Sequence, residues 1–462
     1  MSFTARRLLA SVAAVAIAIL ALRSSLGPFH PVNSPFATEN IFWLAILGLL
    51  CLIPQSSATP HSNKFPRIHL AIALSLIALA FARNLTDPFL SDDYILLNVP
   101  SFNWNVFLAS LHAPGGDGSF RPLGTLYYQF VKSFAGASPL IWHAVGLALH
   151  LLNAALVFLL AWKLWRNRTA AIVATLVFGL NGTRPEAALW TAGNCDLLAS
   201  ACVLGSIILA LNKKIIPSLA LAAVGILFKE SAYALPLIAF FVLWPARQFR
   251  RYLLGAVAVC AALFAWRWHL FHGPGGYLDP TTKQPAILSL HLLTAAKGVL
   301  LRIWDILLVP LNWDAPASWW LPFALTASLL GILYLAATGS KKQLYLIPAT
   351  CCAVLPAIHL VLIGQSELGS RILYLAAAPF ALLIGSLAIA AEKRTLIVCA
   401  IMLAGTTGVL ENNLNAWHEA AMQAQKLCRE ASPNQSAPGT WEGVFLFQNG
   451  FEQCKAAAQN PK

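Results

Sequence analysis

Two adjacent carboxylates, Asp92 and Asp93, lie in a polar stretch that joins two apolar segments (residues 86–130). Acidic side chains just past the end of an apolar segment are costly to place at a membrane, so they usually have a role there. Neighbouring carboxylates push their pKa values apart, which suits such a pair to abstract a proton or to bind a metal ion. The alternative is a solvated loop that is merely acidic. We expect both residues to be catalytic.

A second polar segment, residues 181–196, also lies between two apolar runs. Its hydrogen-bonding side chains frame Trp190, and an aromatic face of this kind can pack on a sugar ring. The segment therefore predicts a pocket for a sugar or a phosphate, and the alternative is a solvated turn. The side chains in question are Arg184, Glu186, Asn194 and Asp196.

Three further positions carry charge where an apolar run begins or ends. Lys229 and Glu230 separate two short apolar runs, and a charge at membrane depth costs about 2.5–3.5 kcal/mol on insertion scales. They form either a structural ion pair or a site in which Lys229 contacts a lipid phosphate. Arg371 opens another run with Tyr374 nearly on the same helix face. Arginine binds phosphate in a bidentate manner, although interfacial snorkelling is the alternative.

A glycine-rich turn follows Arg267, His269 and His272. Two histidines at this spacing are possible metal ligands, but no third ligand is evident, and we interpret the segment as a structural turn. No metal site is predicted. Among the nine cysteines, Cys428 and Cys454 fall in a polar tail and are candidates for a disulfide if the tail lies outside the cytoplasm.

The elements that must position these residues are membrane helices. Hydrophobic residues make up 58% of the 462 residues and charged residues only 11%, against about 25% charged in a soluble protein. The net charge of +13 is better explained by the positive-inside rule than by nucleic-acid binding. We predict an all-α polytopic membrane protein with about 13 transmembrane helices. The apolar runs lie at about 8–22, 40–54, 67–82, 138–162, 169–181, 196–211, 215–228, 231–244, 252–266, 321–337, 345–363, 372–390 and 395–410.

Charge predicts the orientation of these helices. With a cytoplasmic N-terminus, the basic loops (such as Lys163 to Arg168, and Lys213 with Lys214) face the cytoplasm, while nearly all acids face the opposite side. The stretch 215–244 must then be two short helices that turn at Lys229 and Glu230. We predict a transmembrane domain at residues 1–410 with its functional loops on the outer face. A short non-cytoplasmic tail follows at residues 411–462, where WEGVFLFQNGF suggests a hairpin.

Taken together, these segments resemble the GT-C superfamily of integral-membrane glycosyltransferases. The nearest resemblance is to bacterial relatives of the transmembrane and tetratricopeptide-repeat O-mannosyltransferases, without the repeats. It extends from about residue 65 to the C-terminus. It rests on the acidic pair, on Arg121 in FRPL, on Glu186 and Asp196 in NGTRPEAALWTAGNCDLLA, on KESAYALPL from Lys229, and on Arg371 to Tyr374. Asn181, Arg184, Asn194, Cys195 and Ala376 depart from the pattern of the family.

The resemblance implies transfer of a hexose such as mannose from a polyprenyl-phosphate donor to a protein, lipid or glycan acceptor, with inversion at the anomeric carbon. Asp92, or alternatively Asp93, would be the general base. The donor phosphate would bind to Lys229, Arg371, Arg184, Arg267 and Tyr374, and the substrate pocket would include Arg121, Glu186, Trp190 and Asp196. No cofactor is fixed, and a divalent metal (Mg or Mn) is left open. We expect a multi-pass protein of a bacterial inner membrane with a periplasmic C-terminus, and no nucleic-acid partner.

Two other functions are compatible with the sequence. A transporter or flippase of lipid-linked sugars should place polar groups near the bilayer midplane, often in inverted repeats. Here the charges gather at one face and no two halves match, which favours the enzyme. A non-catalytic membrane scaffold of the same fold is the other alternative, and the outer-loop acids with their basic partners argue against it.

Overall fold

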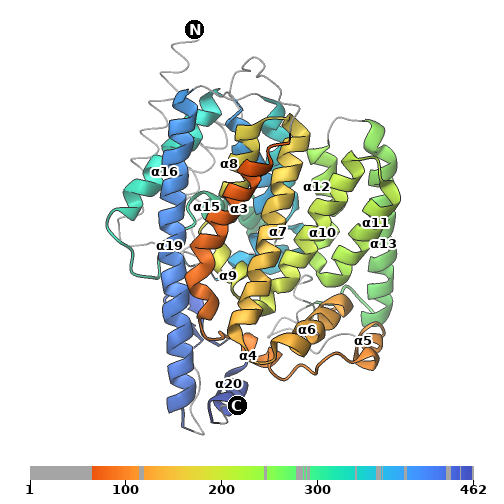
Figure 1. The fold of residues 1–462 in the computed structure, drawn as a ribbon. Coiled ribbons are helices and arrows are strands. Elements are labelled where there is room, and N and C mark those ends of the chain that lie inside the picture. Colours follow the sequence, from red (N-terminus) through yellow and green to blue (C-terminus); the bar gives the residue numbers. More distant parts are fainter. Residues whose placement is uncertain are drawn as a thin grey trace.

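The computed structural model describes residues 65–113, 119–243, 247–276, 285, 288, 292–338, 341–360, 366, 368–389, 393–432, 439–447 and 449–459. The expected spans 8–22 and 40–54 lie outside these residues. Within them the chain is almost wholly helical, as predicted, and the helices run side by side in one bundle (Figure 1). One end of the bundle carries short helices that lie across it, among them α4, α5, α6 and α20 (Figure 1).

The α-helices have the following bounds. They are α3 (Arg67–Phe81), α4 (Asp93–Leu96), α5 (Trp104–Ser110), α6 (Pro122–Ala135), α7 (Pro139–Trp165), α8 (Arg168–Gly179), α9 (Arg184–Ala188), α10 (Asn194–Leu211), α11 (Ile215–Phe228), α12 (Leu235–Val242), α13 (Arg250–Phe271), α14 (Leu292–Lys297), α15 (Ile303–Leu308), α16 (Leu321–Thr338), α17 (Leu346–Cys352), α18 (Ala377–Leu387), α19 (Lys393–Glu430) and α20 (Phe451–Gln459).

Tighter or wider turns and one hairpin complete the described chain. They are η1 (Ala82–Thr86), η2 (Thr191–Gly193), η3 (Glu230–Ala234), η4 (Arg247–Phe249), η5 (Gly298–Arg302), η6 (Lys341–Tyr345), η7 (Leu355–Leu360), η8 (Ser370–Leu373), β1 (Thr440–Trp441) and β2 (Val444–Phe445). The two strands pair in an antiparallel manner with Trp441 opposite Val444, which is the hairpin suggested by the tail sequence.

The outer surface of the bundle is apolar, as a membrane requires. Helix α3 turns Ala73, Ile77 and Phe81 inward, while an outward stripe of Ile68, Ile72, Leu76 and Leu79 is exposed. Helix α10, in contrast to α3, has no exposed stripe of this kind. It is apolar on all sides, because other helices surround it. We therefore describe the chain as an all-α integral membrane protein.

In the part of the chain that the structure describes, five helices are long and apolar enough to cross a membrane: Arg67–Thr86, Pro139–Trp165, Thr191–Leu211, Arg250–Phe271 and Ile397–Glu430. The predicted number of about 13 spans is not confirmed. Helix α18 has 11 residues and a length of about 16 Å, which is too short for a hydrocarbon core of about 30 Å. The run 345–363 is also broken, since α17 ends at Cys352 and Ala357 is non-helical next to Pro356, which lacks a backbone N–H.

Close helix contacts depend on small residues. A Cβ atom added at Gly385 of α18 would lie 2.5 Å from the carbonyl oxygen of Ala170 in α8. The two backbones approach each other closely only because no side chain intervenes.

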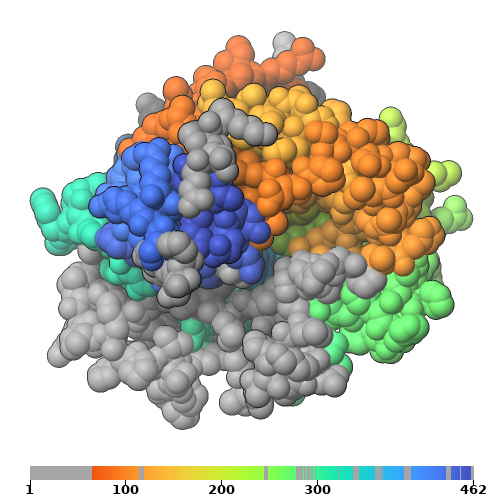
Figure 2. Space-filling model, turned by 90° about the horizontal axis from the view of Figure 1, so that it is seen from below, coloured from red at the N-terminus to blue at the C-terminus, as the bar shows by residue number. Residues whose placement is uncertain are grey.

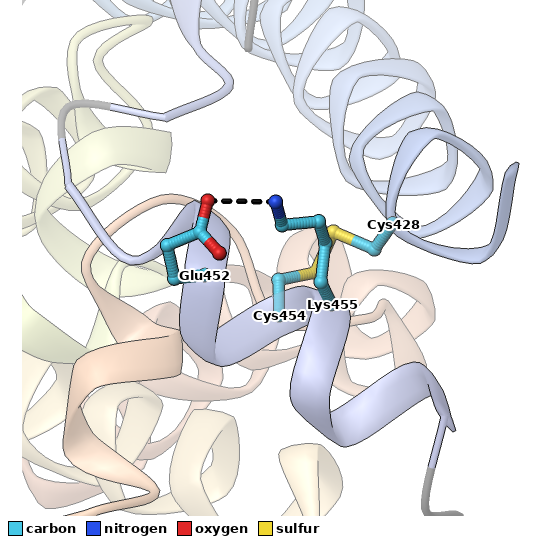
Figure 3. The surroundings of a disulfide bond; sticks show 4 residues. All are labelled: Cys428, Glu452, Cys454 and Lys455. Carbon is cyan, nitrogen blue, oxygen red and sulfur yellow. Dashed lines mark ion pairs between the residues drawn. A yellow bond between two sulfur atoms is a disulfide. The ribbon is translucent and has the colours of Figure 1, made fainter. Parts of the chain in front are cut away.

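The basic and the acidic loops lie at opposite ends of the helices. Lys163 at the end of α7 donates to the Asn212 side chain at the end of α10 (2.6 Å), far along both helices from the acidic loops. Helix α19 continues past residue 410 to Glu430, so the expected domain boundary falls inside an unbroken helix. Beyond it, Cys428 and Cys454 form a disulfide between α19 and α20 (Figure 3).

Candidate active site

The functional loops gather at the end of the bundle that carries α4, α5, α6 and α20. Figure 2 views this end and shows a hollow near its centre, between orange segments of the chain and its blue C-terminal part. The loops with Asp92, Glu186 and Lys229 follow α3, α8 and α11, respectively. The loops meet on one segment, residues 190–196.

The acidic pair is divided between two environments. Ser91, in the left-handed region with φ 53°, turns the chain just before the pair. Asp93 is fully buried and accepts hydrogen bonds from the backbone N–H of Ala192 (2.9 Å) and of Leu90 (3.4 Å). Asp92 is half-buried and accepts from the backbone N–H of Asn449 (3.0 Å). Thus Asp93 ties its loop to the 190–196 segment, while Asp92 contacts the tail.

Burial raises the pKa of the Asp93 carboxyl well above its ordinary value. The hydrogen bonds from Ala192 and Leu90 act in the opposite direction, and the neighbouring charge of Asp92 adds to the increase. The two carboxylates therefore lie in unequal environments, and burial contributes more to the shift at Asp93 than the charge of Asp92 does. Asp92, with the greater exposure, is the better placed of the two to meet a substrate.

Arg371 reaches the 190–196 segment from the turn η8. Its Nη1 donates to the Glu186 carboxylate (2.6 Å), and its guanidinium carbon lies 3.9 Å from the centroid of the Trp190 ring. Glu186 also accepts from the backbone N–H of Arg371 (2.9 Å) and from the Ser370 hydroxyl (3.0 Å). Glu186 is thus a fixed anchor that holds η8, and it orients the guanidinium on the aromatic face.

Lys229 and Glu230 form separate ion pairs rather than one pair with each other. Lys229 bonds to Asp196 at the start of α10. Glu230 accepts from Arg121 through one oxygen (2.9 Å) and from Arg267 through the other (2.9 Å). All of these side chains are mostly buried, with between 5% and 21% of each exposed. These four ion pairs join four cations to three carboxylates (Glu186, Asp196 and Glu230), so this group has one positive charge in excess.

Arg184 and Tyr374 lie inside the protein instead. The Arg184 guanidinium is fully buried, 5.3 Å from the ring centroid of Phe178 and 5.1 Å from that of Tyr374. The Tyr374 hydroxyl is 2.8 Å from Nδ1 of His150. The structure therefore buries these two predicted phosphate ligands in the interior of the protein.

Several polar residues around this site were not predicted. Asn413 of α19 donates to the carbonyls of Gly182 (2.9 Å) and Pro310 (2.7 Å), and the side chain of Asn312 donates to the carbonyl of Glu442 (2.8 Å). A small cavity beside Glu186 is lined by these two asparagines together with Ser370, Trp417 and Phe445. The signal in the sequence was an Asn pair, residues 412–413, at the end of an apolar run.

No group of three His, Cys, Asp or Glu side chains suited to a metal ion occurs among the described residues. Both oxygens of Asp93 accept backbone N–H groups, which compete with metal ligation. We derive no step through a metal. His269 and His272 lie at the end of α13, where His272 has φ 53° and ends the helix.

Comparison with known proteins gives partial similarities. No family model matches the chain. The mouse protein O-mannosyl-transferase TMTC1 is 27% identical over 156 residues, which is 31% of this chain and 17% of that protein. The Drosophila melanogaster protein O-mannosyl-transferase Tmtc1 is 31% identical over 125 residues, or 26% of this chain and 15% of that protein. The chain spans less than a fifth of the length of these relatives. They confirm the predicted resemblance to the O-mannosyltransferases.

Among solved structures, similarity is found to the oligosaccharyltransferase of Archaeoglobus fulgidus. Its crystal structure with Zn and sulfate matches over 79% of this chain and 56% of that chain, with 14% identity and a TM-score of 0.44. The same enzyme tethered with an acceptor peptide matches over 85% of this chain and 63% of that chain, with 13% identity and a TM-score of 0.42.

Proposed function

We propose that this protein is a membrane glycosyltransferase that moves a sugar from a polyprenyl-phosphate donor to an acceptor hydroxyl on the non-cytoplasmic face. The observation that carries the proposal is the convergence on residues 190–196. Asp93 bonds to Ala192, Arg371 lies on Trp190, and Lys229 bonds to Asp196. A half-buried carboxylate can serve as a general base, and cations can stabilise the charge on a leaving phosphate. The similarity to protein O-mannosyl-transferases supports this reaction class.

In the proposed mechanism Asp92 accepts the proton of the acceptor hydroxyl. The hydroxyl oxygen forms a bond to the anomeric carbon, and the bond from that carbon to the phosphate oxygen breaks. The electron pair leaves with the polyprenyl phosphate, so the sugar configuration inverts. Asp93 does not act on the substrate in this scheme, because it is buried and holds the loop of Asp92 against Ala192.

The cations stabilise the charge that develops on the leaving phosphate. An arginine has five N–H donors, and the ion pair of Arg371 with Glu186 uses Nη1. A lysine has three donors, so Lys229 can contact a phosphate while it remains paired with Asp196. Arg121 and Arg267 add positive charge from the far side of Glu230. We place the donor phosphate between Arg371 and Lys229, and the sugar near Trp190.

The proposal is tested by transfer of label from a panel of radiolabelled polyprenyl-phosphate sugars, with the purified protein in detergent and membrane extract as the source of acceptor. Asp92→Asn should lower transfer by about 10²–10⁴-fold, the usual contribution of a general base. Glu430→Gln is the matched control, because Glu430 is an exposed carboxylate at the end of α19. Arg83→Ala is the control for an arginine at the same end, since its pair with Glu411 is largely exposed.

Each result distinguishes the candidate functions. Loss of transfer in Asp92→Asn, with both controls active, supports the enzyme and the role of Asp92. Absence of transfer by the wild-type protein from every donor, with or without divalent metal, favours a transporter of lipid-linked sugars or a scaffold. Transport of the same lipids in reconstituted vesicles then separates these two alternatives.

A further inference from the structure

The C-terminal tail is built against the proposed catalytic loop. The backbone N–H of Asn449 donates to Asp92 (3.0 Å), and the N–H of Ser91 donates to the carbonyl of Leu446 (3.0 Å). The ring of Phe447 lies 6.4 Å from that of Tyr94. Asn449 and Asp92 are more than 350 residues apart in the sequence. The tail is therefore a structural partner of a loop from the first part of the chain.

The tail also touches the second half of the site. Phe445 packs against Trp190 with the ring centroids 6.3 Å apart, and it lines the small cavity beside Glu186. The carbonyl of Glu442 accepts from Asn312 (2.8 Å). The hairpin β1–β2 therefore packs on the aromatic residue beneath Arg371 while the next residues reach Asp92.

Gly450 allows the backbone of the tail to approach the loop of Asp92 closely. Gly450 has φ 86°, and a Cβ atom at this position would lie 2.7 Å from the carbonyl oxygen of Ser91. The residue directly before it is Asn449, so the turn at Gly450 brings the donor N–H to Asp92. Ser91 itself has φ 53°, so both sides of the contact depend on turn conformations.

The tail has few apolar contacts of its own to hold it in this place. Among its described residues, the buried apolar ones are Val444, Leu446, Phe447 and Cys454, and its strands are two residues long. Units of this size usually need a covalent link. That link is the disulfide of Cys428 with Cys454, both buried, which joins the end of α19 to α20 across 26 residues (Figure 3).

We propose that the disulfide-closed tail is a clamp that positions Asp92 for catalysis through the backbone N–H of Asn449, so that the redox state of Cys428 and Cys454 sets the rate of transfer. This inference rests on the proposed function. A dithiol reductant supplies two electrons and two protons to the sulfur–sulfur bond. The products are the two cysteine thiols and the oxidised, cyclic form of the reductant. Opening the link releases α20, and the bond from Asn449 to Asp92 loses its support.

The first experiment compares oxidised wild-type protein, wild-type protein reduced with dithiothreitol, and the double variant C428S/C454S. We expect reduction and the double substitution each to lower kcat about tenfold or more, with KM for the donor within about twofold, because the clamp acts on the base and not on donor binding. The double variant should not respond to reductant. C260S/C352S, in which two partly buried free cysteines are replaced, should retain the wild-type rate and response. A double variant with the wild-type kcat would overturn the proposal.

The second experiment isolates the backbone donor. Asn449→Pro removes the N–H, whereas Asn449→Ala keeps it and removes only an exposed side chain. We expect the proline variant to lose kcat as the reduced protein does, and the alanine variant to match wild type. Equal losses in the two variants would assign the effect to the side chain and overturn the role of the N–H.

A third measurement reads the clamp without activity. Hydrogen exchange of peptides that contain residues 446–450 should be slow in the oxidised protein and fast after reduction. If the wild-type protein transfers no sugar, the proposed function fails while this difference still reports the clamp. If transfer occurs and exchange is unchanged by reduction, the clamp fails and the proposed function stands.

Discussion

The guanidinium carbon of Arg371 lies 3.9 Å from the centre of the Trp190 ring, and Nη1 of the same guanidinium is bound to Glu186 at 2.6 Å. The tryptophan and the carboxylate both belong to the segment 181–196, whereas the arginine follows it by more than 170 residues. The Trp190 ring thus fixes the plane of the Arg371 guanidinium, and the Glu186 carboxylate fixes the direction in which it points. A guanidinium fixed in this way loses little freedom when it binds a phosphate.

The first prediction concerns the shape of this cation. Arg371→Ala should lower kcat by about 10²-fold or more, because it removes a positioned charge from the leaving phosphate. Arg371→Lys keeps the charge but loses the planar contact with Trp190, so we expect it to recover only a small part of the rate. Initial rates with the preferred polyprenyl-phosphate sugar measure both effects. A lysine variant with full activity would show that charge alone is sufficient.

The second prediction concerns the dependence of stability on pH. Burial raises the pKa of Asp93 above that of an unfolded aspartate, about 3.9. The stabilisation associated with its protonated form is complete below the unfolded pKa and is lost as the pH rises through the folded pKa. The Asp93→Asn variant lacks this titrating carboxyl. As the pH rises from acidic to neutral, its thermal midpoint should therefore decrease less than that of the wild-type protein. Thermal unfolding in detergent across this range measures the difference, and parallel curves for wild type and variant would contradict it.

The sequence predicted which residues share an end of the bundle but not which of them pair. The separation of basic from acidic loops is visible along the whole sequence. It therefore predicted that Glu186, Asp196, Lys229 and Arg371 lie at the same end of the helices. The choice of Asp196 for Lys229, and of Arg371 for Glu186, depends on side-chain directions that only the packed loops determine. Adjacent Lys229 and Glu230 were one candidate pair in the sequence, yet each turns to a different partner.

The burial of individual side chains was harder to predict from the sequence than the end of the bundle at which each loop lies. Arg184 follows an Asn-Gly-Thr turn and has the pattern of an exposed loop cation, but it lies between the rings of Phe178 and Tyr374. The same difficulty affected the short helices. An apolar run from residue 345 to 363 predicted one span, but α17 ends at Cys352 and the chain is non-helical at Ala357. Pro356, directly before Ala357, lacks the backbone N–H that a continuous helix needs.

A third prediction follows from the shared carboxylate. Glu230 neutralises two arginines, so Glu230→Gln leaves Arg121 and Arg267 facing each other in a mostly buried site and should destabilise the protein by about 3 kcal/mol. Arg121→Ala leaves the pair of Glu230 with Arg267 intact and should cost about 1 kcal/mol. The double variant should lose less stability than the two single variants lose in sum, because one of the repelling cations is gone. Thermal midpoints of the four proteins test this order, and a larger loss in Arg121→Ala than in Glu230→Gln would refute it.

A final prediction separates structure from catalysis at Tyr374. The carbonyl of Gly179 can only accept, so Nε2 of His150 carries the proton and Nδ1 accepts from the Tyr374 hydroxyl at 2.8 Å. Tyr374→Phe leaves that buried nitrogen without this donor and should cost about 1–3 kcal/mol of stability. Because the hydroxyl lies inside the protein, the folded variant should transfer sugar at the wild-type rate. Tyr345→Phe, at an exposed tyrosine, should change neither quantity. If Tyr374→Phe instead keeps its thermal midpoint and loses transfer, its hydroxyl contacts the donor phosphate, as the sequence predicted.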